Sequence, residues 1–427
     1  MKLLMQTRLS AMMFVEYFVW GAWYVTVGTW LAGTLHFTGQ QIGLAAGATA
    51  VGAVIAPFFV GLVADRFFAT EKVLALLHGI GAVLLFTASM QITFSMFYPV
   101  ILLYCVCFMP TLALTNSLAF RQMTDTKAQF GGIRVLGSLG WIAAGLLIGY
   151  LRLEPTRIPM MMAAAFSGIM AIYCLTLPHT PPLISRSERL SLSSIFPREA
   201  VALLKARDTL IFVIASFLIC IPLQFYYAFT NLFLNQAGVQ NAAGKMTGGQ
   251  MSEVICMLLI PWFFRRLGVK YMLVAGMGAW VLRYLLFAYG NPTDGMWMFW
   301  GGILLHGICY DFFFVTGQIY IDHKADAGFR AAAQGLITFI TYGLGMFVGS
   351  WLSGAVVDHY ALAAPRGAMT YEWKSIWLIS AVISGAVLLF FLFTFSEKED
   401  SEKENAQKED TQNVVEASDT VMGSLPQ

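Results

Sequence analysis

The chain consists of long apolar stretches separated by short polar segments. An α-helix needs about 20 predominantly apolar residues to cross a bilayer. We identify twelve such stretches and no series of short alternating strands, which would be typical of a membrane barrel. The predicted spans are 8–34, 41–65, 72–91, 96–121, 129–152, 157–178, 209–236, 246–266, 271–290, 296–322, 328–357 and 373–396. The pattern therefore predicts an all-α membrane protein with twelve transmembrane helices.

A longer polar segment divides these spans into two groups of six. Residues 178–207 contain four prolines and five basic residues, whereas the other loops are short. We predict an N-terminal six-helix bundle (1–178), a cytoplasmic inter-bundle loop (179–208) and a C-terminal six-helix bundle (209–396). From Glu397 onward, nine acidic residues and three lysines make the chain strongly acidic, so residues 397–427 are predicted to be a disordered cytoplasmic tail.

The composition of the chain indicates a membrane environment, and the distribution of its basic residues indicates how the chain is oriented in the membrane. The chain is 58% hydrophobic and 12% charged, against about 25% charged in soluble proteins. With the N-terminus inside, the inner loops and termini hold 19 of the 26 basic residues and the outer loops hold five. The positive-inside rule then predicts a multi-pass protein of the cytoplasmic (inner) membrane with both termini cytoplasmic. The net charge of +2 reflects topology, so no nucleic-acid partner is predicted.

The cysteines and histidines do not form a ligand pattern. All six cysteines lie within predicted spans, where a thiol usually behaves as a small apolar group. Because the Cys and His residues lack paired ligand spacing outside the spans, we predict no disulfide framework, no metal site and no cofactor.

A weak internal repeat supports the division into two bundles. Gly61–Arg66 ends the second span, and Arg265–Lys270 ends the eighth, so both form turns between the second and third helices of a half. Internal repeats with a central site between them are typical of secondary transporters. The first turn also resembles the loop signature of the major facilitator superfamily, whereas the second lacks its aspartate.

Among the charged residues inside predicted spans, Glu16, Arg134, Glu253 and Asp311 are the candidates for function. Arg283 lies in the ninth span toward the outer side and is predicted to be structural or to snorkel outward. A charge at the bilayer centre costs from about 3 to more than 10 kcal/mol, so such residues usually move ions, bind substrate or neutralise one another. Several share a helix face with polar or aromatic side chains. The faces are Glu16–Trp20–Trp23, Arg134–Ser138–Trp141, Gln224–Tyr227 and Gln250–Glu253; on the tenth span Tyr310 and Asp311 are adjacent, and His306 lies a little over one turn earlier. We predict that these faces surround one wet central cavity.

Simpler roles are open for several of these residues. Arg134 could pair with Asp311 or Glu253 to hold the halves together. Glu16 could pair with a cation in a loop, and His306 could pack as a neutral ring. Trp20 and Trp23 of the first span could equally pack against other helices, lie in the aromatic belt at the membrane surface, or bind substrate.

The predicted cavity suits a neutral polar molecule that contains a ring. Carboxylate and amide groups are good partners for vicinal hydroxyls and for base edges, and aromatic faces stack on flat rings. Arg134 is the one clearly buried cation and faces two or three acids. A strongly anionic substrate such as a nucleotide is therefore disfavoured, and a nucleoside or, less specifically, a sugar is favoured.

At this point the chain resembles a known family across about residues 8–396. It is similar to the nucleoside:proton symporters of the major facilitator superfamily, the NupG-like permeases, and within them to the YegT-like branch. The matching segments are Trp20–Trp23, Phe108–Thr111, Ile133–Ser138, Leu282–Tyr284, Phe287–Gly290, His306–Phe312 and Arg330–Gly335.

The resemblance implies a set of site residues and some departures. By match, the substrate-binding residues are Arg134, Ser138, Trp141, Gln224, Gln250, Glu253, Tyr310 and Asp311. Tyr227 stands where well-known members have Asn, and His306 stands where they have Tyr. Both are included in the predicted site as residues that alter which nucleoside is preferred. Glu16 stands where some relatives have Gln.

We therefore predict a secondary transporter that imports nucleosides by proton symport, with alternating access around a central site. Asp311 and Glu253 are the predicted proton-coupling residues. The alternative is a sugar or drug transporter of the same superfamily. No nucleophile–base pair or metal cluster suggests a membrane enzyme, and a channel would lack coupled accumulation. The expected partners are a nucleoside, protons and the lipid bilayer, with the protein as a monomer.

Overall fold

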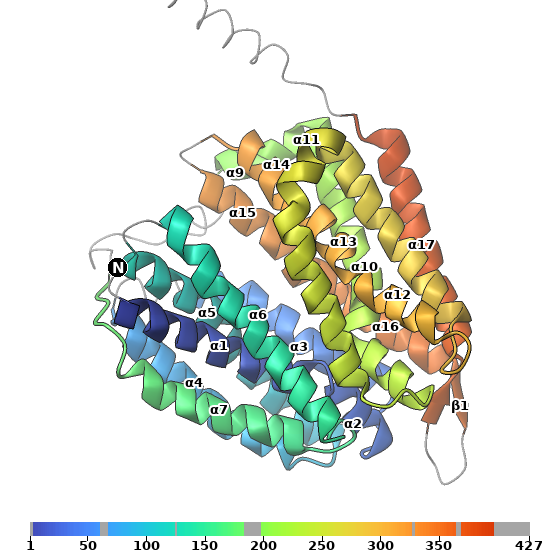
Figure 1. The fold of residues 1–427 in the computed structure, drawn as a ribbon, viewed down its shortest axis with the longest axis horizontal. Coiled ribbons are helices and arrows are strands. Elements are labelled where there is room, and N and C mark those ends of the chain that lie inside the picture. Colours follow the sequence, from blue (N-terminus) through green and yellow to red (C-terminus); the bar gives the residue numbers. More distant parts are fainter. Residues whose placement is uncertain are drawn as a thin grey trace, which may run out of the picture.

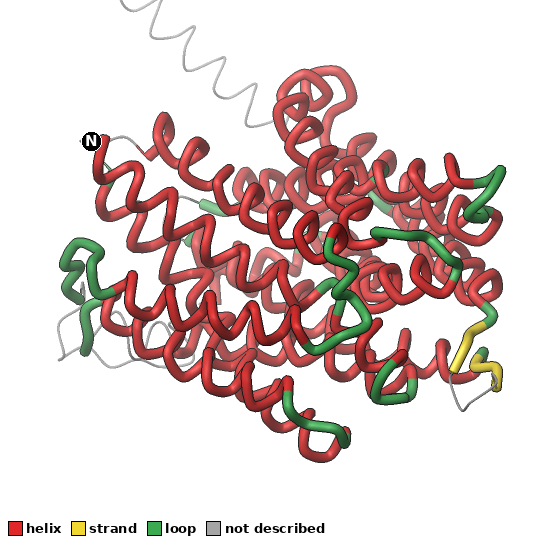
Figure 2. The backbone as a smooth tube through the Cα atoms, turned by 60° about the horizontal axis from the view of Figure 1, so that its bottom comes forward, coloured by secondary structure: helices red, strands yellow, loops and turns green. Residues whose placement is uncertain are grey.

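Helices make up nearly all of the structure (Figure 2). The computed structural model describes residues 3–59, 67–123, 126–182, 198–326, 329–363 and 369–396. The first half contains α1 (Leu3–Tyr24), α2 (Val27–Gly33), α3 (Gly39–Phe59), α4 (Thr70–Ser89), α5 (Phe94–Gln122), α6 (Thr126–Tyr150) and α7 (Ile158–Cys174). The second half contains α9 (Arg198–Ala202), η2 (Leu203–Lys205), α10 (Arg207–Gln236), α11 (Ala242–Tyr289), α12 (Met296–Leu304), α13 (His306–Tyr310), η3 (Asp311–Val315), α14 (Thr316–Lys324), α15 (Arg330–Thr338), η4 (Phe339–Gly345), α16 (Met346–His359), β1 (Ala361–Ala363), β2 (Met369–Tyr371) and α17 (Trp373–Thr394).

These helices have the character of membrane spans. Within the described ranges, nine helices are long and apolar enough to cross a membrane, and α7 is a shorter apolar helix. Helices suit lipid because every backbone polar group within them is bonded inside the segment. Large apolar side chains such as Ile172, Leu258 and Phe393 remain exposed on the outside, where lipid would cover them. The all-α membrane fold is thereby confirmed, whereas the count of twelve spans stays a prediction.

Two of the predicted spans make up α11, which consists of two helices joined at Gly268, where the chain reverses direction. Gly268 has φ 67° and ψ 177°, a backbone conformation that glycine adopts without a steric penalty. Figure 1 shows the chain running up to the α11 label and back down. This reversal falls in the basic turn Arg265–Lys270, where the sequence places the boundary between two spans.

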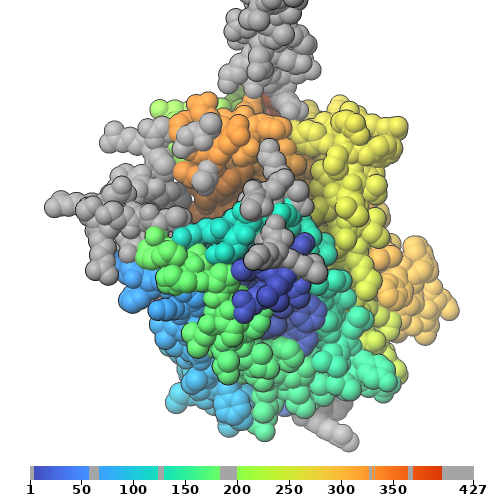
Figure 3. All heavy atoms as spheres, turned by 60° about the vertical axis from the view of Figure 1, so that its left-hand side comes forward, coloured from blue at the N-terminus to red at the C-terminus, as the bar shows by residue number. Residues whose placement is uncertain are grey.

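The helices form two bundles that meet at one end and diverge at the other. Within the first bundle α1 packs along α6 and α7, and within the second α17 packs along α10 and α11. The bundles contact each other mainly through α3 with α16 and α6 with α11. Figure 3 shows the blue-to-green and yellow-to-orange halves as two masses that meet along a boundary. We call the end with α2, β1 and β2 the hairpin end, and the opposite end, with the N-terminus, the N-terminal end (Figure 1).

Two short strands were not predicted from the sequence. β1 and β2 pair antiparallel, with Ala361 opposite Tyr371, in the loop between α16 and α17. Each strand has only three residues, which is too short to show an alternating pattern. Three predicted features lie outside the described residues: the Gly61–Arg66 signature, most of the inter-bundle loop (183–197), and the acidic tail (397–427).

Candidate functional site

A cavity of about 160 Å³ lies between the two bundles. Its walls combine many aromatic and apolar side chains with a few polar groups, which is typical of sites for small molecules. The lining residues are Tyr17, Trp20, Tyr24, Thr49, Ala50, Ala53, Met109, Arg134, Ser138, Trp141, Tyr227, Gln250, Glu253, His306, Tyr310, Tyr342 and Met346. Both halves of the chain therefore contribute to one site.

Most of the predicted substrate-binding residues line this cavity. They are Arg134, Ser138, Trp141, Tyr227, Gln250, Glu253, His306 and Tyr310. Gln224 and Asp311 are fully buried beside the cavity without lining it. The structure thus brings eight of the ten predicted residues to one surface, whereas their roles stay predictions.

The face of α6 that carries Arg134, Ser138 and Trp141 points into the cavity. The Arg134 guanidinium carbon lies 4.1 Å from the centroid of the Tyr17 ring, a cation–π contact. Arg134 forms no ion pair with a carboxylate of the described residues, so its planar group is held by an aromatic face. The Trp141 ring meets the Trp20 ring edge-on, with centroids 5.4 Å apart and an interplanar angle of 77°.

Opposite α6, the helices α11 and α13 bring an acid and a histidine together. Glu253 Oε2 and His306 Nε2 are 3.7 Å apart, which is longer than a hydrogen bond. The His306 ring stacks on Tyr226, with centroids 5.2 Å apart and an angle of 19°. The Arg283 guanidinium carbon lies 4.2 Å from the centroid of the same Tyr226 ring. Arg283 is therefore buried behind the cavity wall rather than snorkelling outward.

Two tyrosines beside or within π-helical stretches are paired at the cavity wall. Tyr310 directly precedes η3, and Tyr342 lies within η4. Their hydroxyl oxygens are 2.6 Å apart. π-helical turns occur frequently at functional sites because they redirect side chains. This hydroxyl pair connects α13 to η4 and offers the cavity both a donor and an acceptor.

Asp311 and Gln224 are buried polar groups whose side chains have no hydrogen-bond partner among the described residues. Asp311 begins η3 and is fully buried, and neither of its carboxylate oxygens has a hydrogen-bond partner among the described residues. Glu253 is close enough to interact with it electrostatically. Gln224 is also fully buried, and its amide oxygen and nitrogen have no partner within the described ranges. Buried polar groups of this kind are costly, which favours a role that depends on rearrangement or on a ligand.

The predicted face of α1 was shifted by one residue. We expected Glu16, Trp20 and Trp23 to face the cavity, but only Trp20 lines it, together with Tyr17 and Tyr24. Residues 17, 20 and 24 share a face at i, i+3 and i+7. Glu16 and Trp23 instead point into the core of the first bundle, where both are fully buried.

Glu16 belongs to a buried hydrogen-bond network rather than pairing with a loop cation. Its Oε2 atom lies 2.8 Å from His78 Nε2, and its Oε1 atom accepts a hydrogen bond from Thr111 Oγ1 at 2.6 Å. His78 Nδ1 lies 3.1 Å from Ser167 Oγ. The network joins α1, α4, α5 and α7. It satisfies these polar groups and fixes the rotation of α1, which carries Tyr17 and Trp20 on its neighbouring face.

Sequence reasoning missed Tyr17, Tyr24, Thr49 and Tyr342 as lining residues. Helical spacing on α1 would have found Tyr17 and Tyr24, but nothing in the apolar stretch around Tyr342 separates it from packing residues. Among the described residues, no group of three or more His, Cys, Asp or Glu side chains is arranged to hold a metal ion. The cavity thus has one guanidinium, one carboxylate and one imidazole among aromatic walls, a nearly balanced charge.

Comparisons with known proteins agree on one family. A profile described as "Nucleoside H+ symporter" matches residues 1–400. YegT of Escherichia coli (strain K12) is 39% identical over 403 residues, covering 92% of this chain and 94% of that protein. The xanthosine permease of the same organism is 33% identical, covering 92% and 96%. The crystal structure of the nucleoside transporter NupG superposes with a TM-score of 0.84 at 31% identity, covering 93% of this chain and all of that one.

Proposed function

Because the chain belongs to the nucleoside H⁺ symporter family, we propose that it imports nucleosides together with protons by alternating access around the cavity between its bundles. The observation that carries this proposal is the cavity itself, which joins aromatic faces, hydrogen-bonding groups and balanced charge in one place. The alternative of a sugar or drug transporter is not favoured, since the family profile spans nearly the whole chain.

The cavity offers separate groups for the two parts of a nucleoside. Trp20, Trp141 and Tyr227 supply ring faces for a base. Gln250 and Glu253 supply the amide and carboxylate oxygens that accept hydrogen bonds from ribose hydroxyls or base amino groups. We assign Arg134, Ser138, His306, Tyr310 and Asp311 to the binding of the same substrate. Gln224, which is buried behind the cavity wall, would contact the substrate only after the wall rearranges.

We assign proton coupling to Asp311 and Glu253. A buried carboxyl without a hydrogen-bond partner is far more stable neutral than charged. Asp311 has this environment, and Glu253 links it electrostatically to the cavity. A substrate that contacts Glu253 would therefore change the electrostatic environment of Asp311, and this would couple nucleoside binding to proton binding.

We further propose that this is the inward-facing state of an inner-membrane monomer with both termini cytoplasmic. The bundles, residues 1–178 and 209–396, diverge toward the N-terminal end and meet at the hairpin end (Figure 1). The excess of basic residues in the loops at the N-terminal end supports a cytoplasmic location of that end. The cavity would then communicate with the cytoplasm, and the hairpin end would face outward.

Uptake into proteoliposomes tests the proposal. We expect labelled nucleosides to accumulate against a concentration gradient when a proton gradient is imposed, and to stop accumulating when a protonophore is added. Ribose and a disaccharide serve as controls without a base. Accumulation of a sugar instead of any nucleoside would overturn the substrate assignment. Nucleoside uptake that is the same with and without a proton gradient would overturn the symport mechanism.

Trp141→Ala is expected to weaken nucleoside binding by about ten- to a hundredfold. Stacking of a base on an aromatic ring is worth about 1–3 kcal/mol, and about 1.4 kcal/mol corresponds to a tenfold change in Kd. Binding of free ribose should change much less, and Trp141→Phe should retain part of the affinity. Titrations of purified protein measure both ligands. Trp351→Ala, a half-exposed tryptophan on α16, is the matched control, and equal losses for nucleoside and ribose would assign Trp141 to helix packing.

A further inference from the structure

Two carboxylates at the hairpin end accept hydrogen bonds from the beginning of a helix in the opposite bundle. Asp358, near the end of α16, accepts from the backbone N–H groups of Gly39 and Gln40 at the start of α3, the latter at 2.9 Å. Glu154, in the loop after α6, accepts from the backbone N–H of Ala243 at the start of α11, at 2.5 Å. Each bundle thus provides one carboxylate and one helix start.

The two contacts occupy equivalent places in the internal repeat. In the order of predicted spans, α3 is the second and the first part of α11 is the eighth, six spans later. Likewise, α6 is the fifth and the α15–α16 segment is the eleventh. Carboxylates at the ends of the fifth and eleventh spans therefore bind the starts of the eighth and second spans. The same contact occurs twice, related by the pseudo-symmetry of the halves.

Both contacts have a clear physical basis. The first N–H groups of a helix lack intrahelical partners, and the helix dipole makes this end positive. A carboxylate there forms charge-assisted hydrogen bonds. Neither contact can survive separation of the bundles, because the carboxylate and the helix start are on opposite sides of the interface.

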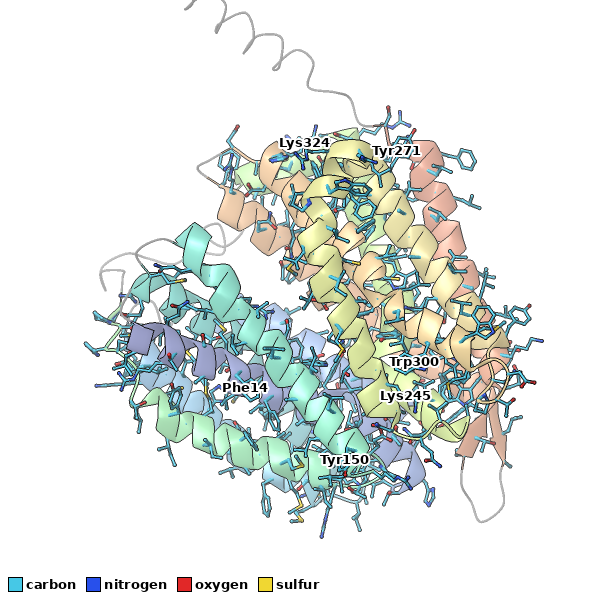
Figure 4. The ribbon with its side chains drawn as sticks, viewed as in Figure 1. Phe14, Tyr150, Lys245, Tyr271, Trp300 and Lys324 are labelled. Carbon is cyan, nitrogen blue, oxygen red and sulfur yellow. The ribbon has the colours of Figure 1, made fainter. Side chains whose placement is uncertain are left out.

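Close helix packing surrounds each contact. A Cβ atom on Gly43 of α3 would overlap the backbone oxygen of Ser350 on α16. Similarly, a Cβ atom on Gly149 of α6 would overlap the side-chain oxygen of Asn241. The backbones approach closely at both positions, so the hairpin end is closed by direct contact between the bundles. Figure 4 shows Tyr150 and Lys245, from the two bundles, near each other at this end.

We propose that Glu154 and Asp358 are paired closing contacts of the transport cycle, which hold the hairpin end shut while the cavity is open toward the N-terminal end. This inference rests on the proposed function, since alternating access is what requires the bundles to separate at this end. It assigns a role in transport to two residues that lie away from the substrate cavity.

Glu154 also makes this closure sensitive to pH. Burial raises the pKa of Glu154 above its ordinary value, although the Ala243 N–H, the amides of Asn231 and Asn235 and the charge of Lys245 act in the opposite direction. Because the raised pKa belongs to the closed arrangement, this arrangement binds a proton on Glu154 more tightly than an open arrangement in which the carboxylate reaches water. The protonated carboxyl still accepts the Ala243 N–H through its carbonyl oxygen, so acidification on the hairpin side favours closure.

Electron–electron distance measurements on spin labels test the proposal directly. In a background without the six native cysteines, labels at positions 151 and 362 report on the hairpin end, because Leu151 and Leu362 are half-exposed and lie on opposite bundles. A second pair, at positions 4 and 271, reports on the N-terminal end. Wild-type protein should show mainly the short distance between 151 and 362.

Glu154→Ala and Asp358→Ala, which remove the acceptor, should each raise the ratio of long to short distances by about three- to tenfold, and the double variant should raise it further. Glu372→Ala is the matched control, because Glu372 also accepts a hydrogen bond at a helix start, from Ser375 N–H at 2.8 Å, but within one bundle. Glu154→Asp and Asp358→Glu, which keep a carboxylate acceptor, should retain the short distance in part. An unchanged distribution in the double variant, or an equal shift with Glu372→Ala, would overturn the proposal.

A pH titration provides the test if the double variant does not fold. The wild-type ratio of long to short distances should fall as the pH is lowered, and Glu154→Gln, which cannot titrate, should remove this response. A wild-type ratio that does not respond to pH would overturn the role of Glu154. These distances are recorded without substrate, so a failure here is distinct from a failure of nucleoside uptake in the proteoliposome assay.

Discussion

Asp311→Asn is expected to abolish gradient-driven accumulation of nucleoside while leaving exchange of nucleoside across the membrane intact. Asparagine keeps the size and shape of the side chain, but it cannot bind and release a proton in the cycle. A membrane potential of 100 mV supplies about 2.3 kcal/mol per proton, which corresponds to about fiftyfold accumulation of a neutral solute. The variant should therefore fall from accumulation of this order to a ratio near one, measured in proteoliposomes with an imposed gradient.

The control for this experiment is Asp294→Asn, the same substitution at an exposed position before α12. It should leave accumulation unchanged. Glu253→Gln should also lose coupling, with weaker nucleoside binding in addition, because Glu253 lines the cavity whereas Asp311 does not. Full accumulation by both variants would exclude these two acids as the proton carriers.

Arg134→Lys is expected to reduce nucleoside affinity by at least about tenfold despite the retained charge. The planar guanidinium stacks on Tyr17 at 4.1 Å and presents forked donors to the cavity. A lysine ammonium has neither the plane nor the fork, and loss of one charge-assisted hydrogen bond corresponds to about 1.5–3 kcal/mol. A titration of purified protein with nucleoside measures the effect.

Arg265→Lys, at an exposed position in the basic turn of α11, is the matched control and should bind nucleoside as the wild type does. Arg134→Ala should lose at least as much affinity as the lysine variant. If Arg134→Lys bound nucleoside normally and only Arg134→Ala failed, Arg134 would serve as a plain positive charge rather than as a geometric ligand.

The sequence predicted the cavity best where one regular helix carries several site residues. Arg134, Ser138 and Trp141 are all on α6, and their spacing alone places them on a single face. Helical spacing shows which residues of one helix share a face, but it does not show whether that face points toward the cavity, the bundle core or the lipid. The structure brings all three side chains to the cavity wall, while their roles in substrate binding stay predictions.

On α1 the same reasoning failed by one residue. The buried charge of Glu16 suggested the cavity face, but His78 and Thr111 satisfy it inside the bundle. Those partners come from α4 and α5, so only tertiary packing reveals them. Tyr342 was missed for a related reason. Its hydroxyl partner, Tyr310, lies 32 residues earlier in the chain, and only the folded structure brings the two hydroxyl oxygens to within 2.6 Å of each other.

The π-helical stretch η4 (Phe339–Gly345) has a consequence for comparing sequences. A π turn closes hydrogen bonds from i to i+5, so it holds one residue more than an α turn. The corresponding segment of the first half, α6, is α-helical throughout its described length. An alignment of the two halves therefore needs an inserted residue near Tyr342, and an ungapped alignment pairs the wrong side chains beyond it. Deleting one codon there would convert the π turn to an α turn and leave the two flanking parts of the helix in their present orientation, whereas the same deletion within α6 would rotate one part of that helix by about 100° relative to the other.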